Sequence, residues 1–221
     1  MLQKAEKRSS FNKNRLLIIV GSLIFLSGVF IYAFNIYNNK TLDIKDNEQV
    51  NDFIDKNKEV KVQEIKINDE MIESKEQTTP SSKINEYIGV IEIPKINVKR
   101  GFYNIENTNN NVNKNVEVIK GSSMPNVGKG NFILAAHSGS GRVAYFKNVY
   151  KLENQDEIFI YFNNTKYKYQ VIDKYEVDKI GKVLIHRDKD ITALTLTTCS
   201  QTDKTKQIVV IAKLIEEERY E

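Results

Sequence analysis

The hydrophobic positions along this chain follow two contrasting patterns. Residues 16–34, LLIIVGSLIFLSGVFIYAF, form an apolar run of 19 residues without a charge. That length is close to the ~20 residues that a helix needs to cross a bilayer. From about Asn85 onward, apolar residues instead alternate with polar ones in short runs, as in strands with one buried face. The pattern predicts an N-terminal helix followed by an all-β domain.

The apolar run is predicted to be a retained transmembrane anchor over 16–37. Five basic residues and a single acid, Glu6, precede it. By the positive-inside rule, residues 1–15 then form a cytoplasmic tail and the rest of the chain is exported. A cleaved signal peptide is the alternative, but its apolar core is usually shorter. The residues after Phe34, NIYNNKTLD, also lack a small-x-small cleavage site.

Residues 38–84 are predicted to form an extracellular linker. The stretch is rich in Asn, Asp, Glu and Lys, contains no glycine and ends in the loop signal TTPSS. A charged segment of this kind buries too little apolar surface to fold alone. Some apolar periodicity in EVKVQEIKIN, residues 59–68, leaves a short helix or strand open.

Residues 85–221 are predicted to form one all-β domain with short helices. Two of its strand-like segments flank the turn NNT and therefore read as a hairpin. Seven or eight short strands are typical of a closed barrel or a sandwich. The predicted strands are 87–93, 115–119, 131–136, 157–162, 166–177, 193–198 and 207–215.

The composition excludes several classes of function. A formal net charge of +4 over 221 residues is small, and nucleic-acid binders normally show a concentrated basic face. We therefore expect no nucleic-acid partner. Cys199 is the only cysteine, which rules out an intrachain disulfide and a multi-cysteine metal cluster. The carboxylates are scattered without paired metal-ligand spacing, so the sequence assigns no metal site, calcium included, and no cofactor.

The single cysteine is the candidate nucleophile. Cys199 ends the alternating run ALTLTT and precedes polar SQTDKTK, and a strand end lets a side chain reach a groove. A small buried hydrophobe is the alternative role of a lone cysteine. A thiol needs a base or a cationic neighbour to act as a nucleophile near neutral pH. His137, between NFILAA and SGSGR, fits that role better than His186, whose neighbours LIHRDKD are typical of a solvated loop.

These residues together resemble the sortases, the membrane-anchored cysteine transpeptidases of Gram-positive bacteria. TLTTC, ending at Cys199, resembles the family's TLxTC signature. VIKGSSMPNVGKGNFILAAHSG (118–139) resembles the segment that leads to the family's catalytic histidine. YIGVIEIPKINVK (87–99) resembles the first strand, and AYFKNVYKLENQDEIFIY (144–161) the stretch after the histidine, with Asn-Gln-Asp at 154–156 in place of the usual Gly-Asp.

The resemblance, which covers about residues 87–215, implies both a fold and a reaction. The fold is an eight-stranded β-barrel with Cys199 and His137 on neighbouring strands at one end of a groove. The thiolate of Cys199 attacks a carbonyl in a C-terminal sorting motif of a secreted protein, and His137 protonates the departing amine. An amine of a cell-wall precursor or a pilin then resolves the thioacyl enzyme. The protein is accordingly expected at the cell membrane, with its catalytic domain outside.

One departure from the family concerns the third catalytic residue. Sortases normally carry an arginine a few residues after the cysteine, where it holds substrate and stabilises the oxyanion. Here the loop reads SQTDKTKQIVV, and Lys206 or Gln207 takes that position, depending on the register. Lysine is a point charge without the planar fork of a guanidinium, while glutamine donates a neutral amide hydrogen bond. Arg142, in the loop after His137, is a more distant candidate.

The missing arginine leaves a second kind of function open. The alternative to a transpeptidase is a non-catalytic or weakly active membrane-anchored β-barrel that binds peptides or cell-wall components. A hydrolytic cysteine peptidase, in which water rather than an amine resolves the thioester, is a third option.

Overall fold

The computed structural model describes residues 3–67 and 86–219, with side chains over 15–56 and 86–219. These residues divide into two compact units, Met1–Lys45 and Asp46–Glu221.

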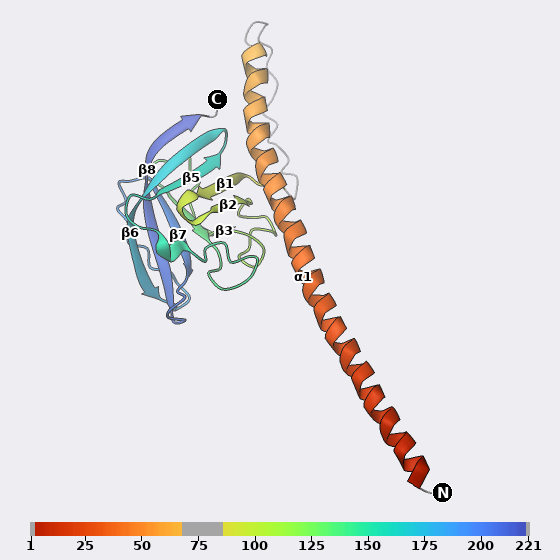
Figure 1. Cartoon of the computed structure of the whole chain (residues 1–221). Helices are drawn as coiled ribbons and strands as arrows, with labels where there is room; N and C mark the ends of the chain where they lie inside the picture. Colours follow the sequence, from red (N-terminus) through yellow and green to blue (C-terminus); the bar gives the residue numbers. More distant parts are fainter. Residues whose placement is uncertain (1–2, 68–85, 220–221) are drawn as a thin grey trace. The chain divides into compact units, whose positions relative to one another are not determined.

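The described residues of the first unit lie within the long helix α1 (Gln3–Ile67) (Figure 1). Its stretch Arg15–Lys56 is long and apolar enough to cross a membrane, with a mean hydropathy of 2.5 in its most apolar window. The large apolar side chains between Leu16 and Tyr37 are 41–71% exposed. Exposed apolar surface costs about 25 cal/mol per Å² in water, so this part of the helix is suited to a lipid environment.

The helix does not end where the apolar run ends. Residues 38–67, predicted as a polar spacer, continue α1 as far as Ile67. The stretch contains no glycine or proline, and its frequent Glu, Lys and Gln residues have good helix propensity. Residues 68–84 of the predicted linker lie outside the described residues.

The second unit contains an eight-stranded sheet that curls into a nearly closed barrel (Figure 1). The strand order is β2-β1-β5-β6-β8-β7-β4-β3. A bridge between Phe102 and Val116 links the two edges of the sheet. The barrel confirms the predicted all-β fold with short helices and removes the sandwich alternative. Its elements are β1 (Gly89–Ile93), η1 (Pro94–Ile96), β2 (Val98–Phe102), β3 (Glu117–Val118), β4 (Asn131–Ala135), η2 (Val149–Lys151), β5 (Glu157–Phe162), β6 (Thr165–Asp178), β7 (Ala193–Cys199) and β8 (Lys206–Arg219).

One strand, β2, was missing from the prediction. Lys99 and Arg100 occupy its middle and interrupt the apolar alternation that marks a strand. The guanidinium of Arg100 lies 4.9 Å from the ring centroid of Tyr145. That cation–π contact lets a charged residue occupy a half-buried strand position.

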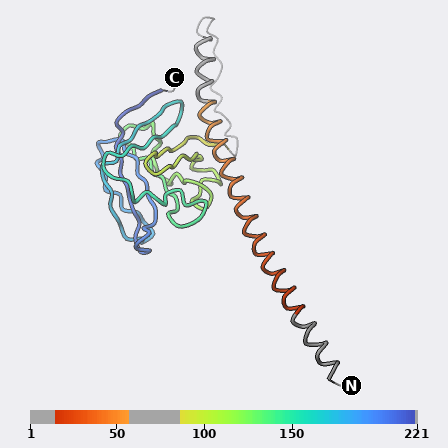
Figure 2. Tube along the Cα trace, viewed as in Figure 1, coloured from red at the N-terminus to blue at the C-terminus, as the bar shows by residue number. Residues whose placement is uncertain are grey.

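Strand β7 is the central element for function. It lies between β4 and β8, and six of its seven residues are buried, the exception being Cys199 at its end. β4 and β7 are far apart in the sequence but run parallel and side by side (Figure 2). Because parallel strands point the same way, their C-terminal ends meet at one edge of the barrel.

Candidate active site

The predicted nucleophile and its predicted partner follow this shared strand edge. In the β4–β7 register Ala135 lies opposite Thr197, so His137 and Cys199 each stand two residues further along. Two side-chain hydrogen bonds join the strand ends here. Thr198 Oγ1 donates to Ala136 O at 2.7 Å, and Ser138 Oγ donates to Cys199 O at 2.5 Å. These bonds join the two backbone segments that carry His137 and Cys199.

Both side chains open into one cavity, which we call the cysteine cleft, with a volume of 510 Å³. Cys199 is a free, half-buried cysteine, so its sulfur is not sealed in the core. The structure thus brings the two predicted residues into the same cleft. The cleft is lined by His137, Ser138, Gly139, Ser140, Lys147, Cys199, Ser200, Gln201 and Lys204.

The ring of His137 is not bonded to the sulfur in this state. Its Nε2 lies 3.0 Å from Asn113 Oδ1. An amide oxygen can only accept, so this contact requires a proton on Nε2. Catalytic hydrogen bonds are often long or misaligned in free enzymes and tighten when substrate binds. Asn113 therefore holds the His137 ring at the cleft through Nε2, and this contact does not involve the other ring nitrogen, Nδ1.

Two other residues considered from the sequence are engaged elsewhere. His186 stacks on Tyr175, with 5.1 Å between ring centroids, and its backbone N–H donates to Tyr175 Oη at 2.6 Å. It belongs to the loop between β6 and β7 and does not line the cysteine cleft. Arg142 pairs with Asp46, with 3.2 Å between Nη1 and Oδ2.

The strand register separates the two candidates for the missing arginine. Gln207 lies directly opposite Cys199 on β7 and opposite Val177 on β6. Directly opposed residues of antiparallel strands project from the same face, so Gln207 shares the face of the cysteine. Lys206 lies one residue away, opposite Asp178, and therefore projects from the other face. Gln207 also carries a buried amide oxygen, Oε1, that has no hydrogen-bond partner.

A residue that sequence reasoning missed makes direct contact with the thiol. Lys179, which immediately follows β6, places its Nζ 3.4 Å from Cys199 Sγ. Its backbone N–H donates to Thr205 O at 2.7 Å. No local motif marks this lysine, because its place depends on β6 pairing with β8 beside β7.

The cysteine cleft is a cationic environment. Lys147 and Lys204 line it together with His137, and no carboxylate is among the described residues that do so. Gln201 closes one wall, because its Nε2 donates to the backbone oxygens of Ser138 and Lys147 at 2.8 and 2.5 Å. Such surroundings stabilise anionic species such as a thiolate or an oxyanion. Among the described residues, no group of three or more His, Cys, Asp or Glu side chains is arranged to hold a metal ion.

The loop between β7 and β8 is braced by an acid. Asp203 Oδ1 accepts hydrogen bonds from the hydroxyl and the backbone N–H of Thr205, at 2.5 and 2.8 Å. These two bonds, the hydroxyl first, lower the pKa of Asp203 below its ordinary value of 3.8. The brace sets the span of the loop that returns the chain from Cys199 to β8.

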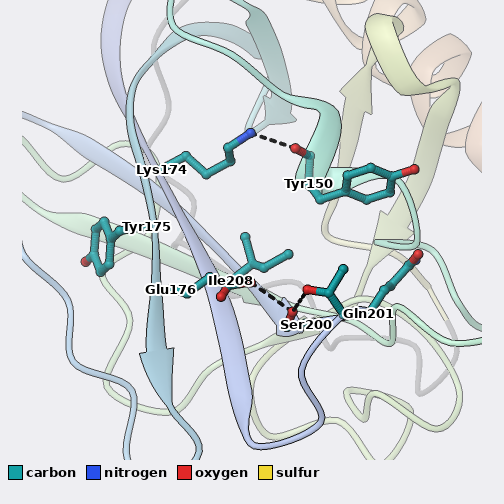
Figure 3. A pocket seen from close by; sticks show the side chains of 8 residues that line it. Tyr150, Lys174, Tyr175, Glu176, Ser200, Gln201 and Ile208 are labelled. Atoms are coloured by element: carbon teal, nitrogen blue, oxygen red, sulfur yellow. Dashed lines mark hydrogen bonds between the residues drawn. The ribbon is translucent and has the colours of Figure 1, made fainter.

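A second cavity of 420 Å³, which we call the tyrosine cavity, shares Ser200 and Gln201 with the cysteine cleft. Lys174 Nζ donates to the backbone oxygens of Tyr150 and Leu152 at 2.6 and 2.7 Å. Figure 3 shows Lys174 pointing to Tyr150, and Ser200 bonded to Glu176. Its lining residues are Tyr150, Lys174, Tyr175, Glu176, Ser200, Gln201, Thr202 and Ile208.

Comparison with known proteins gives a consistent result. A family model described as the sortase domain matches residues 91–215. Sortase A of Bacillus anthracis is 28% identical over 211 residues, which cover 92% of this chain and 97% of that protein. The structure of Listeria monocytogenes sortase A is 24% identical, with a TM-score of 0.53 over 62% of this chain and 92% of its own. A lid mutant of Corynebacterium diphtheriae sortase A is 22% identical, with a TM-score of 0.56 over 63% and 76% of the two chains.

Proposed function

The chain belongs to the sortase family, a family of cysteine transpeptidases, and we propose that it is an active member with Cys199 as nucleophile and His137 as general acid and base. The observation that carries the proposal is the placement of both side chains in one cleft, at the ends of parallel strands β7 and β4. A partly exposed thiol among cations, in a cleft that an imidazole also lines, is an environment in which a cysteine can attack a carbonyl carbon.

The proposed reaction has two half-reactions. The Cys199 thiolate attacks a backbone carbonyl carbon of the substrate, a sulfur–carbon bond forms, and the carbon–nitrogen bond breaks as His137 gives a proton to the departing amine. In the second half, a neutral amine attacks the thioester carbon and loses a proton to His137. The carbon–sulfur bond breaks, and the thiolate and a new amide bond result. The thioester preserves the reactivity of the cleaved bond between the two steps.

Gln207 is proposed to hold the substrate beside the sulfur. Its amide oxygen is buried without a partner, and such an unsatisfied acceptor costs about 1–3 kcal/mol. A backbone N–H of a bound peptide would satisfy this oxygen. The lysine cations of the cysteine cleft would stabilise the tetrahedral oxyanion, a task for which Lys206 is placed on the wrong face of β8.

The proposed substrates are secreted proteins with a C-terminal sorting motif. The proposed acceptor is an amine of a peptidoglycan precursor or a pilin. We place the chain in the cell membrane as a single-pass protein with its catalytic domain outside. The exposed apolar stretch of α1 and the basic residues before it support this topology, since positive charge favours the cytoplasmic side.

Mass spectrometry of trapped adducts tests the proposal. The full-length chain in detergent is incubated with a library of peptides that resemble C-terminal sorting motifs, with and without a small amine such as glycinamide. We expect a thioacyl adduct on Cys199, followed by transfer to the amine. The Cys199→Ala variant should give neither product. If no peptide in a broad library forms an adduct, the proposal fails.

The same experiment decides between the proposed function and its alternatives. A hydrolytic peptidase would release free acid and no amine adduct when glycinamide is present. A peptide-binding barrel would retain peptides without any change in the mass of Cys199. Gln207 lies opposite Cys199, where the family's arginine is expected. This difference from the family is the observation that favours a peptide-binding barrel as the second candidate function.

A further inference from the structure

Backbone hydrogen bonds hold Lys179 where its side chain can reach the Cys199 sulfur. Its backbone N–H donates to Thr205 O at 2.7 Å, and the next residue, Ile180, donates to Asp178 O at 3.1 Å. These two bonds anchor the end of β6 to the loop that follows Cys199. The side chain then needs only to extend toward β7, where Nζ lies 3.4 Å from Cys199 Sγ.

We propose that Lys179 is a catalytic residue that stabilises the Cys199 thiolate through its ammonium group, a role that rests on the transpeptidase function proposed above. A cation within hydrogen-bond distance of a sulfur favours the thiolate over the thiol. Lys179 keeps its own protons throughout the reaction. The proton of the thiol passes to the imidazole of His137, which is thereby charged for its task of protonating the departing amine.

The other groups around the sulfur do not replace Lys179. His137 is bonded to Asn113, and Gln207, directly opposite the cysteine, is neutral. Lys147 and Lys204 line the same cleft and add a positive field. Among the hydrogen bonds of the described residues, only the one from Lys179 reaches Cys199 Sγ.

No described carboxylate competes for this ammonium. The ion pairs of the barrel use other lysines, and Asp178, the residue before Lys179, lies opposite Lys206 in the β6–β8 register. Glu176, the next acid along β6, bonds to Ser200 Oγ at 2.8 Å and lines the tyrosine cavity instead. The Lys179 ammonium therefore interacts with the Cys199 sulfur without competition from these acids.

Alkylation of the only cysteine isolates this role from turnover. The full-length chain in detergent reacts with iodoacetamide from about pH 5 to about pH 10, and intact mass reports the fraction of Cys199 modified, since the thiolate is the reacting form. In Lys179→Gln we expect the rate at neutral pH to fall about tenfold, because the cation beside the sulfur is lost. Lys179→Arg, which keeps the charge, should stay within about threefold of the parent protein.

The matched control is Lys182→Gln, an exposed lysine three residues further along the same loop. It should leave the profile unchanged, because it removes one positive charge without touching the sulfur. An unchanged rate in Lys179→Gln, or an equal fall in both variants, would overturn the inference. The assay uses no peptide. A Lys179-dependent rate in a protein without transfer activity would overturn the proposed function and the catalytic role of Lys179, and would leave only its stabilisation of the thiolate.

Discussion

The cysteine cleft and the tyrosine cavity are similar in size, 510 and 420 Å³, but opposite in character. Among the described residues, the cleft is lined by lysines and a histidine and by no carboxylate. The tyrosine cavity balances Lys174 against Glu176 and adds two tyrosines. Figure 3 shows that its charged groups already have partners, the Tyr150 carbonyl for Lys174 and Ser200 for Glu176. Volume alone therefore does not identify the reactive site.

The pleat of three adjacent strands produces this difference. Val177, Gln207 and Cys199 are opposite one another across β6, β8 and β7. The neighbouring row is Glu176, Ile208 and Thr198. Because successive side chains of a strand point to opposite faces, a shift of one residue moves a side chain to the other face of the sheet. Glu176, the acid of this neighbouring row, is thereby kept on the face away from the thiol.

The two histidines offer the largest expected contrast. His137 lines the cysteine cleft, whereas His186 stacks on Tyr175 in the loop between β6 and β7. We expect His137→Ala to lower the rate of acyl transfer by about 10²- to 10⁴-fold, the usual contribution of general acid–base catalysis. His186→Ala should change it by less than about threefold. Single-turnover kinetics with an adduct-forming peptide measures both rates, and equal losses would contradict the assignment of the histidines.

The second prediction concerns a double variant in which the positive charge is removed from the end of β6 and placed on the adjacent strand, β8. In Lys179→Gln, the further substitution Gln207→Arg places a guanidinium directly opposite Cys199. A cation is then again beside the sulfur, so we expect the rate of alkylation at neutral pH to recover by about tenfold. Gln207→Lys, with a shorter reach of hydrogen-bond donors, should recover less. Recovery by neither variant would show that position 207 is not directed at the thiol.

The sequence predicts the residues at the strand ends, Cys199 and His137. It does not predict which residues of the neighbouring strands lie beside them. Cys199 and His137 were predicted because each follows an apolar alternation that is visible in the chain itself. The choice between Lys206 and Gln207 stayed open, since it depends on how many residues the loop after Cys199 uses before β8 pairs with β7. Lys179 was missed for the same reason. Its neighbour is set by the β6–β8 pairing, and no local pattern records that register.

The barrel was predicted largely by alternation, and the exceptions have physical causes. β2 was missed because Arg100 interrupts its apolar pattern and is accommodated by the ring of Tyr145. The composition of residues 38–67, rich in Asn, Asp, Glu and Lys, predicts a spacer. The stretch is helical within α1, since a segment without glycine or proline can continue a helix that the apolar run has already nucleated.

The third prediction separates stability from reactivity across the two cavities. Lys174→Met removes the donors that bind the carbonyls of Tyr150 and Leu152 and keeps most of the side-chain stem. We expect the free energy of unfolding to fall by about 2 kcal/mol, because two hydrogen bonds worth about 1 kcal/mol each are lost, without a change in alkylation of Cys199. Lys179→Gln should instead slow the alkylation of Cys199 and leave the free energy of unfolding unchanged. Urea unfolding followed by circular dichroism measures stability, and a slower alkylation in Lys174→Met would show that the cavities are coupled.

The smallest expected effect is a pH dependence of the loop that joins β7 to β8. Hydrogen bonds from Thr205 lower the pKa of Asp203 below 3.8, so the folded state favours the charged carboxylate. The resulting stabilisation is present above the ordinary pKa of Asp203 and is lost as pH falls through its lower folded pKa. Asp203→Asn removes the charge at every pH but keeps an acceptor oxygen. At neutral pH we therefore expect the Thr205 amide to exchange with solvent only about threefold faster.

Hydrogen exchange at Thr205 separates this brace from a general loosening of the barrel. Asp188→Asn is the matched control, because Asp188 Oδ1 accepts from the Asp190 backbone N–H at 2.8 Å in the loop between β6 and β7. It should leave the Thr205 amide unchanged. Since Lys179 donates its own backbone N–H to Thr205 O, a loosened brace should also release the lysine from the sulfur. Faster exchange in Asp203→Asn with an unaltered rate of Cys199 alkylation would show that the lysine holds its place beside the thiol without the loop.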